Sequence, residues 1–318
     1  MNETKARKVV IIGAGHVGSH CALSLLFSRE VDELVLIDIK EEKARMQALD
    51  LDDAASNLSH RVRVRAGTYD DCTDAQVVVM AAGKTRLPGQ TRLDMFDDSI
   101  AIMNDIVGPL KASGFSGILL SISNPADIVG DFLRKRLGLP KNRVFSTGTS
   151  LDSARLRRIL SEILGIDRRS IQACSIGEHG DSQVVPVSHC TVGGVPLPAY
   201  TAAHPELAEK LSAPYLSEQV QQAGMRVVIG KGCTEFGIGM VCCDLVRAIF
   251  RDERRILPVS TLLEGEYGER GIHAGVPAVI GKNGVERVIE WTLAPEEAAR
   301  FHQSCEVLRG FTARADQM

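Results

Sequence analysis

The sequence predicts an α/β protein in which a doubly wound parallel sheet is followed by an α+β region. About the first 150 residues alternate short apolar runs with longer segments of helical spacing. A strand buried on both faces of a parallel sheet is apolar almost throughout, as these short runs are. Beyond this point the pattern changes to longer helices and antiparallel hairpin signals.

The parallel sheet is predicted from four apolar runs and the helical segments between them. The strands are expected at residues 9–12, 34–37, 77–80 and 118–122, and the helices at 16–28, 41–58 and 93–113. Residues 61–65 alternate arginine with valine, which favours a strand near the edge of the sheet. Strands that alternate with helices pair in parallel through right-handed crossovers, so an open, doubly wound sheet follows.

The second half is predicted to combine helices with antiparallel strands. Residues 150–164 carry apolar side chains at i, i+3, i+4 and i+7, the spacing of an amphipathic helix. Strands are expected at 185–192, before the turn Gly193-Gly194, and at 278–280 and 285–291, around a turn at 282–284. Further helices are expected at 205–229, 235–250 and 295–308. No flexible linker interrupts the chain, so we predict two domains in tight contact, residues 1–148 and 149–318.

Charge and composition exclude several classes of protein. The 318 residues include 37 Lys and Arg against 40 Asp and Glu, a net charge of -3, which gives no electrostatic reason for a nucleic-acid or anionic membrane partner. No stretch approaches the roughly 20 apolar residues that span a bilayer, and no signal peptide is visible, so a cytoplasmic location is expected. The eight cysteines include no C-x-x-C pair, so buried thiols are expected in place of disulfides or a metal site.

A glycine-rich turn predicts a dinucleotide site. Gly13, Gly15 and Gly18 form a G-x-G-x-x-G motif between the first predicted strand and the first predicted helix. Gly13 permits the tight turn, Gly15 admits a pyrophosphate and Gly18 lets helix and strand pack closely, while the helix N-terminus attracts phosphate. Asp38 ends the next strand, 20 residues after Gly18, where a carboxylate accepts both ribose hydroxyls and repels a 2′-phosphate. NAD is therefore predicted over NADP; the alternative is a purely structural turn with an acidic residue nearby.

Four further segments follow this turn in order. They are residues 87–94 (LPGQTRLD), 123–125 (SNP), 151–155 (LDSAR) and 176–181 (IGEHGD). Together with the glycine-rich turn they resemble the L-lactate/L-malate dehydrogenase family, and the resemblance covers nearly the whole chain, including residues 231–234 and the last hairpin. It implies a Rossmann domain that binds NAD, followed by a substrate domain that carries the catalytic residues.

Three residues of these segments suit the reduction of a 2-oxo acid. His179 is the predicted acid/base, because the ordinary pKa of histidine, about 6.5, lies near operating pH. Asp152 is expected to hold the other ring nitrogen and to favour the imidazolium form. Arg155 lies three residues after Asp152 on one predicted helix, so both project from the same face, and its guanidinium is expected to grip the substrate carboxylate. Taken singly, the alternatives are a structural histidine and a surface ion pair.

The resemblance implies roles for three more residues. Arg92 lies in a segment that resembles the family's mobile loop and is implied to polarise the substrate carbonyl once the loop closes and excludes water. Asn124 follows a predicted strand, at the edge where such sheets bind ligands, and is implied to hydrogen-bond near the nicotinamide and the substrate oxygen. Thr234 is implied to line the substrate pocket. Without the family pattern, Arg92 would be a solvated surface side chain.

The same loop predicts the substrate. In the family, lactate dehydrogenases usually carry Gln six residues before the position of Arg92 and malate dehydrogenases carry Arg; here the residue is Arg86. A guanidinium pairs with the second carboxylate of oxaloacetate, but loses its water without compensation beside the methyl group of pyruvate. Gln90 agrees, because lactate enzymes typically have Glu there. We therefore expect L-malate and oxaloacetate, in the tricarboxylic acid cycle, with L-lactate and pyruvate or another L-2-hydroxy acid as the alternative.

The resemblance also bears on regulation and assembly. Bacterial lactate dehydrogenases activated by fructose 1,6-bisphosphate use an Arg and a His at a subunit interface; Arg157 matches the first, but Gln172 stands at the second, so no such activation is expected. A homotetramer, or a dimer, is suggested. A function of another class, a non-catalytic NAD-sensing module, stays open because fold does not fix function. The intact set of predicted catalytic residues argues against it.

Overall fold

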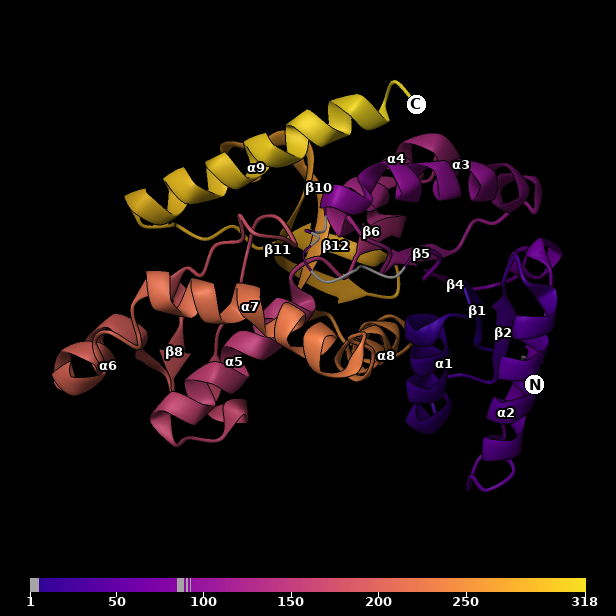
Figure 1. Cartoon of the computed structure of the whole chain (residues 1–318), viewed down its shortest axis with the longest axis horizontal. Helices are drawn as coiled ribbons and strands as arrows, with labels where there is room; N and C mark the ends of the chain where they lie inside the picture. The colour runs from indigo at the N-terminus through magenta and orange to yellow at the C-terminus, as the bar shows by residue number, and fades with distance from the viewer. Residues whose placement is uncertain (1–5, 85–88, 90, 92) are drawn as a thin grey trace.

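A nine-stranded sheet forms the centre of the molecule (Figure 1). The computed structural model describes residues 6–84, 89, 91 and 93–318. Within this part of the chain the strands lie in the order β12-β11-β10-β6-β5-β4-β1-β2-β3. The predicted fold class, a doubly wound parallel sheet followed by an α+β region, is confirmed.

The parallel part of the sheet comes from the first half of the chain. Its strands are β1 (Lys8–Ile12), β2 (Glu33–Ile37), β3 (Arg63–Ala66), β4 (Val77–Met80), β5 (Ile118–Ser121) and β6 (Val144–Ser146). β1 pairs in parallel with β2 on one side and with β4 on the other, so the winding of the chain reverses between β1 and β4. Open α/β sheets bind ligands beside such a reversal, at the carboxyl ends of the strands. β3, the arginine–valine segment, lies at the edge as predicted.

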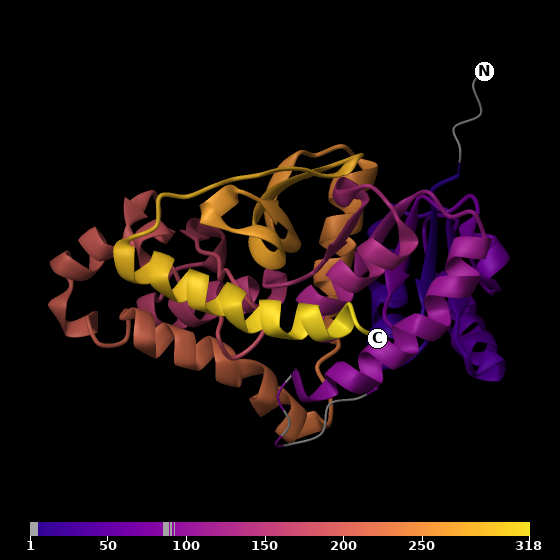
Figure 2. The ribbon, with the colours of Figure 1, turned by 90° about the horizontal axis from the view of Figure 1, so that it is seen from above.

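Helices cover both faces of this sheet, because neighbouring residues of a strand point to opposite faces. Val9 and Ile11 of β1 share a core with α1 (His16–Ser28), α2 (Glu41–Ala55) and α8 (Phe236–Phe250). Val10 and Ile12 share a core on the other face with α3 (Phe96–Ala112), α4 (Ala126–Leu137) and α9 (Pro295–Ala315). The last helix, α9, thus reaches back across the molecule to α4 (Figure 2).

The second half continues the same sheet with three antiparallel strands. They are β10 (Arg255–Glu264), β11 (Arg270–Gly281) and β12 (Gly284–Val288). β10 joins the parallel part where Ser260 pairs with Ser146 of β6. A small sheet packs beside three helices around a third core; these elements are β7 (Ile171–Gln172), β8 (Thr191–Val192), β9 (Val195–Pro196), α5 (Ser150–Leu164), α6 (Leu197–Ala203) and α7 (Ala213–Lys231).

Some predicted elements of the second half differ from the structure. The strand predicted at 185–192 is wrong: only Thr191–Val192 belongs to a strand, and Val187–His189 forms a 3-10 turn after Pro186, which has no N–H to donate. The helix predicted from residue 205 begins at Ala213, after a cap by Ser212. Strands β6 and β10 and helix α4 have no counterpart among the predicted elements. Because one sheet contains strands of both halves, the division of the chain at residues 148 and 149 stays a prediction.

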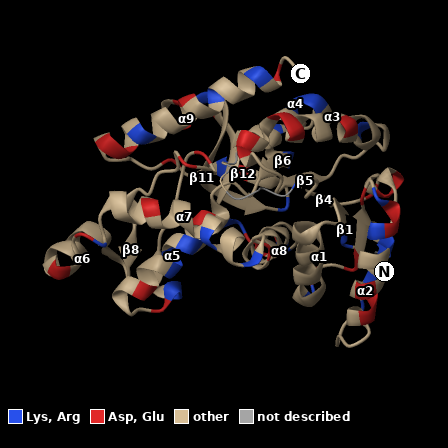
Figure 3. Cartoon of the chain, in the orientation of Figure 1, with Lys and Arg blue, Asp and Glu red and all other residues tan. Residues whose placement is uncertain are grey.

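The surface carries charges of both signs. Lys and Arg are interspersed with Asp and Glu along α2, α5 and α9 (Figure 3). Among the described residues, no helix is long and apolar enough to cross a membrane. Six of the eight cysteines are buried thiols, whereas Cys174 and Cys233 are partly exposed.

Candidate active site

A cavity of about 190 Å³ lies beside the reversal between β1 and β4. Its wall includes residues that follow β1, β4 and β5, together with residues from α5 and from the start of α8. Five residues predicted from the sequence line it: Gly15, Asn124, Arg155, His179 and Thr234. The fold therefore brings both halves of the chain to the edge of the sheet where such folds bind ligands.

The glycine-rich turn leaves space for a phosphate group at the start of α1. Gly13 has a φ of 104°, and a Cβ added there would lie 2.6 Å from the backbone N of Ala82. A Cβ on Gly18 would lie 1.8 Å from the carbonyl oxygen of Gly13, so glycine alone lets α1 approach the turn. At Gly15 the nearest atom to an added Cβ is Nζ of Lys43, at 3.9 Å, so this residue borders open space. A diphosphate can therefore reach the backbone N–H groups of the turn and helix.

Asp38 is fixed beside the same turn. Its Oδ2 accepts a hydrogen bond from the backbone N–H of Ala14 (2.8 Å), and its Oδ1 accepts one from that of Lys40 (2.9 Å). Each carboxylate oxygen can accept a second hydrogen bond. The arrangement fits the two ribose hydroxyls of an adenosine without a 2′-phosphate.

His179 and Asp152 form a hydrogen-bonded pair. Asp152 lies in the first turn of α5 and is fully buried, at 0% exposure. The Nδ1–H of His179 donates to Oδ2 of Asp152, and because a carboxylate only accepts, the proton of the neutral ring is on Nδ1. Nε2 is then the ring nitrogen that can accept a proton from a bound molecule. A carboxylate at Nδ1 also stabilises the imidazolium that forms when Nε2 gains a proton.

Asp127 holds the backbone of this histidine from the other half of the chain. It lies on α4, and its Oδ2 accepts from the backbone N–H of His179 at 2.8 Å. Burial raises the pKa of Asp127 to about 7, against the opposing effects of the nearby Ser260 side chain and of the hydrogen bond from the His179 backbone. Asp127 is not among the residues predicted from the sequence, although it stands only two positions after the Ser-Asn-Pro segment.

Arg155 shares the carboxylate of Asp152. Its Nη1 donates to Oδ1 of Asp152 at 3.1 Å, and its side chain is 11% exposed. The guanidinium lies against Gly224 of α7, where an added Cβ would come within 3.3 Å of Nη1 and Nη2. Glycine thus leaves the space that the guanidinium occupies, a role that no motif around residue 224 indicates. From this position in the cavity wall, Arg155 can bind the carboxylate of a ligand.

Asn124 offers the cavity a buried acceptor. It follows β5, and its carbonyl oxygen accepts from Oγ of Ser99 at 2.6 Å. Its side-chain Oδ1 is buried and has no hydrogen-bond partner among the described residues. Because an unpaired buried acceptor is unfavourable, a donor such as the carboxamide of a nicotinamide or a substrate hydroxyl would stabilise it. Thr234, from the segment between α7 and α8, lines the same cavity.

Arg86, Gln90 and Arg92 lie outside the residues that the structure describes, so the roles expected of them stay predictions. Gly83 precedes this stretch and Met95 follows it, and both line the cavity. The two ends of the predicted loop are therefore in the cavity wall.

Comparisons with known proteins bear on this geometry. Residues 7–146 match the lactate/malate dehydrogenase NAD binding domain, and residues 149–315 match the lactate/malate dehydrogenase alpha/beta C-terminal domain. The chain is 45% identical to an L-lactate dehydrogenase of Fusobacterium nucleatum, with 96% of each chain covered. It is 43% identical to an L-lactate dehydrogenase 1 of Staphylococcus aureus, with 100% of each covered. The crystal structure of the minor L-lactate dehydrogenase from Enterococcus mundtii in the ligands-bound form superposes with a TM-score of 0.93, at 41% identity, over 98% of this chain and 99% of that one.

These comparisons correct the predicted substrate. The expectation of L-malate and oxaloacetate, and with it a place in the tricarboxylic acid cycle, is wrong, because relatives at 43% and 45% identity are named L-lactate dehydrogenases. The expectation depended on two side chains of one loop, those of Arg86 and Gln90, whereas a pocket selects its ligand through all the side chains that line it. The alternative, lactate and pyruvate, is better supported. The predicted cofactor, NAD, is confirmed by the match to an NAD-binding domain.

Proposed function

The chain belongs to the lactate/malate dehydrogenase family, and from this premise we propose that it is an NAD-dependent L-lactate dehydrogenase, which interconverts L-lactate and pyruvate. The observation that carries the proposal is the buried carboxylate of Asp152, which bonds to both His179 and Arg155 beside the cavity. An acid/base and a carboxylate anchor are what a 2-hydroxy acid needs next to a hydride acceptor. The named relatives support the choice of lactate.

In the proposed reaction, His179 moves the proton of the substrate hydroxyl. During oxidation of lactate, Nε2 of His179 takes the hydroxyl proton while the hydride on C2 leaves with its electron pair; during reduction of pyruvate, the imidazolium returns the proton to the carbonyl oxygen. NAD(H), when bound, accepts or supplies the hydride. Asp152 stabilises the imidazolium, so the charge that forms beside the substrate is balanced.

Arg155 is proposed to position the substrate. Two parallel hydrogen bonds from its guanidinium to the C1 carboxylate would fix C2 relative to His179. Arg92 is proposed to polarise the substrate oxygen. The other predicted residues are proposed to hold the dinucleotide or line the pocket; they are Gly13, Gly15, Gly18, Asp38, Asn124 and Thr234.

Steady-state kinetics with NADH test this function. With pyruvate and oxaloacetate compared at the same NADH concentration, kcat/KM is expected to be higher for pyruvate. A higher kcat/KM for oxaloacetate contradicts the choice of lactate. If the protein binds NADH but oxidises it with neither 2-oxo acid, it is a non-catalytic NAD-sensing module and the enzymatic proposal fails.

A homo-oligomer, either a dimer or a tetramer, is part of the proposal. Large apolar side chains are exposed on α1 and on α2 and α8, which each contact α1: Phe27, Met46, Leu49, Phe236 and Met240 are between 45% and 63% exposed. Apolar surface of this kind often marks a protein contact. Light scattering is expected to give a multiple of the 34.4 kDa chain mass, and a double change of Met46 and Leu49 to Lys is expected to lower it. If light scattering gives the mass of one chain for the unaltered protein, the proposal of a homo-oligomer is contradicted.

Insensitivity to fructose 1,6-bisphosphate stays a prediction. Arg157, the one cation that matches the activated enzymes, donates from Nη1 to the carbonyl oxygen of Ala173 at 3.1 Å. Gln172, at the second position, is uncharged.

A further inference from the structure

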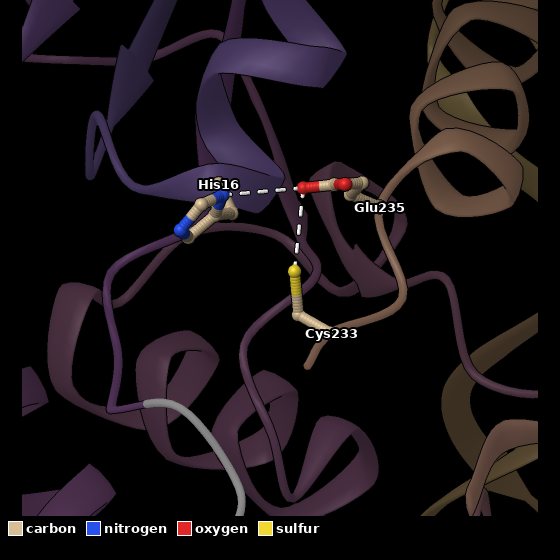
Figure 4. A group of neighbouring side chains, drawn as sticks. All are labelled: His16, Cys233 and Glu235. Atoms are coloured by element: carbon tan, nitrogen blue, oxygen red, sulfur yellow. Dashed lines mark hydrogen bonds and ion pairs between the residues drawn. The ribbon is translucent and has the colours of Figure 1, made fainter. Parts of the chain in front are cut away.

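Three potential metal ligands meet where α1 faces the start of α8. They are His16, the first residue of α1; Cys233, between α7 and α8; and Glu235, which directly precedes α8 (Figure 4). Nδ1 of His16 and Sγ of Cys233 each lie 3.3 Å from Oε2 of Glu235. All three ligand atoms lie within 4.8 Å of one another. Sequence spacing cannot indicate this cluster, because most of the chain separates His16 from the other two residues.

Glu235 is held in the state and orientation of a metal ligand. Its side chain is 9% exposed, and Nζ of Lys231 lies 2.5 Å from Oε1. This lysine lowers the pKa of Glu235, so the carboxylate stays ionised. Lys231 is itself placed over the ring of Phe236, 3.8 Å from its centroid. With Oε1 bonded to the lysine, Oε2 is the oxygen presented to the imidazole and the thiol. Nδ1 of His20, also on α1, lies 3.4 Å from the same Oε2.

The donor set and its dimensions suit zinc. Imidazole, thiolate and carboxylate are ligands that Zn²⁺ binds, whereas Ca²⁺ and Mg²⁺ prefer oxygen. Ligands at the usual bond lengths to a tetrahedral zinc ion are about 3.5 Å apart, close to the two separations of 3.3 Å found here. The imidazole of His16 is 73% exposed, so it can turn toward the thiol without displacing a buried neighbour. Burial raises the pKa of the Cys233 thiol, so binding must displace a proton from its sulfur.

We propose that His16, Cys233 and Glu235 form a site for a transition-metal ion of the Zn²⁺ class, and that the bound ion and NAD(H) exclude one another. His16 and Cys233 line the cavity together with Gly15 of the dinucleotide turn, so an ion between them occupies part of its wall. The thiolate and the carboxylate match the two charges of the ion, so the exclusion rests on the space that the ion takes in the cavity wall and not on charge repulsion. Three protein ligands leave a fourth position for water, as in other open zinc sites.

Titration of the protein with Co²⁺, a spectroscopic substitute for Zn²⁺, tests the site. A thiolate-to-cobalt absorption band is expected, saturating at one ion per chain and removed by Zn²⁺. Cys233→Ser is expected to abolish the band, and His16→Asn or Glu235→Gln to weaken binding by at least about tenfold. Cys174→Ser, which changes the other partly exposed thiol, is the matched control and is expected to leave the titration unchanged. Thermal unfolding without metal shows whether each variant is folded. Cys233→Ala is a second variant that lacks the thiolate, for use if Cys233→Ser does not fold.

The same titration with saturating NADH tests the exclusion. The Co²⁺ concentration at half-saturation is expected to rise several-fold; an unchanged value means that ion and dinucleotide bind independently, and contradicts this part of the proposal. A band that persists in Cys233→Ser, or is missing from the unaltered protein, overturns the site and leaves a hydrogen-bonded cluster that ties α1 to α8. The readout is absorption by a metal complex, so it does not depend on the lactate proposal.

Discussion

Asp152 connects the residues that we propose as acid/base and as substrate anchor. Its Oδ2 accepts from His179 and its Oδ1 from Arg155, and the side chain is fully buried. Desolvation of a carboxylate is unfavourable, and two such partners offset it. Because Asp152 lies in the first turn of α5, the positive end of the helix dipole also stabilises its negative charge. A change at Asp152 is therefore expected to affect the proposed acid/base and the proposed substrate anchor together.

Asp152→Asn is expected to lower kcat for pyruvate reduction by about a hundredfold or more, as expected when general acid–base catalysis is lost. An uncharged amide does not stabilise the imidazolium of His179. NADH binding, followed by fluorescence, is expected to persist because the glycine-rich turn is separate from α5. Asp167→Asn is the control: it removes a carboxylate that pairs with Arg169 on the surface, and kcat is expected to stay unchanged. Nearly normal kcat in Asp152→Asn would contradict the assigned role.

The sequence predicts the members of this site better than their contacts. The spacing of Asp152 and Arg155 places them on one face of a helix, and the structure bonds Asp152 to His179 beside the cavity that Arg155 also lines. The hydrogen bond from Arg155 to the same carboxylate has the i, i+3 spacing of an ion pair, but the burial of that pair does not follow from spacing. Neither does the contact of Asp127, which reaches the backbone of His179 from the other half of the chain. Contacts between distant segments depend on the packing of the whole chain, which no local pattern encodes.

At the scale of single elements, helix α7 carries two glycines in different surroundings. An added Cβ at Gly224 would lie 3.3 Å from the guanidinium nitrogens of Arg155, whereas one at Gly230 would meet nothing within 4 Å. Alanine is favoured over glycine inside a helix by up to about 1 kcal/mol. Alanine at Gly230 therefore changes only the stability of the helix, whereas alanine at Gly224 also disturbs the guanidinium of Arg155.

Gly224→Ala is expected to raise KM for pyruvate several-fold, because Arg155 must move to admit the methyl group, while the affinity for NADH changes little. Gly230→Ala, in the same helix, is expected to leave KM unchanged and the free energy of unfolding equal or higher. Steady-state kinetics and urea unfolding at one protein concentration give these quantities. If KM is unaltered in Gly224→Ala, the guanidinium is either not confined there or does not bind the substrate.

The helices were easier to predict than the antiparallel strands. The helices expected at 16–28 and 150–164 agree with α1 and α5 at both ends. For α5, apolar spacing coincides with an end signal, the C-cap Gly165. β10 escapes prediction because Pro258 interrupts its apolar run, and proline usually marks the edge of a sheet. In the structure Pro258 lies opposite Pro277 of β11, so the two residues without a backbone N–H face each other, and the pairing of β10 with β11 continues on both sides of them. The pairing of the two prolines can be recognised only when β10 and β11 are seen side by side.

At the scale of the whole molecule, two buried groups give folding opposite dependences on pH. Burial raises the pKa of Asp127 to about 7, so between about pH 4 and pH 7 the folded chain holds a proton that the unfolded chain releases, and stability falls as pH rises. Burial lowers the pKa of His273, on β11, to about 4, against the attraction of Asp131. Here the unfolded chain holds the extra proton, so stability rises with pH up to about 6.5. The two effects oppose each other where they overlap.

Asp127→Asn isolates the first of these effects, because asparagine does not titrate and the contribution of His273 cancels between variant and unaltered protein. We subtract the free energy of unfolding of the unaltered protein from that of the variant, and we expect this difference to increase between about pH 4 and pH 7. The increase is expected to reach up to about 4 kcal/mol, because each tenfold change in proton affinity equals about 1.4 kcal/mol. Urea unfolding at constant protein concentration measures it.

Asp167→Asn provides the matched control for this pH series. Hydrogen bonds from Arg169 lower the pKa of Asp167 to about 2. The difference in free energy of unfolding between Asp167→Asn and the unaltered protein is therefore expected not to change with pH above about pH 4. An equally flat difference for Asp127→Asn would mean that Asp127 is ionised in the folded chain throughout this range. The backbone of His179 would then be held by a buried carboxylate. An increase with pH instead means that a neutral carboxylic acid on α4 holds it below about pH 7, and that the two halves of the chain meet at a group whose charge depends on pH.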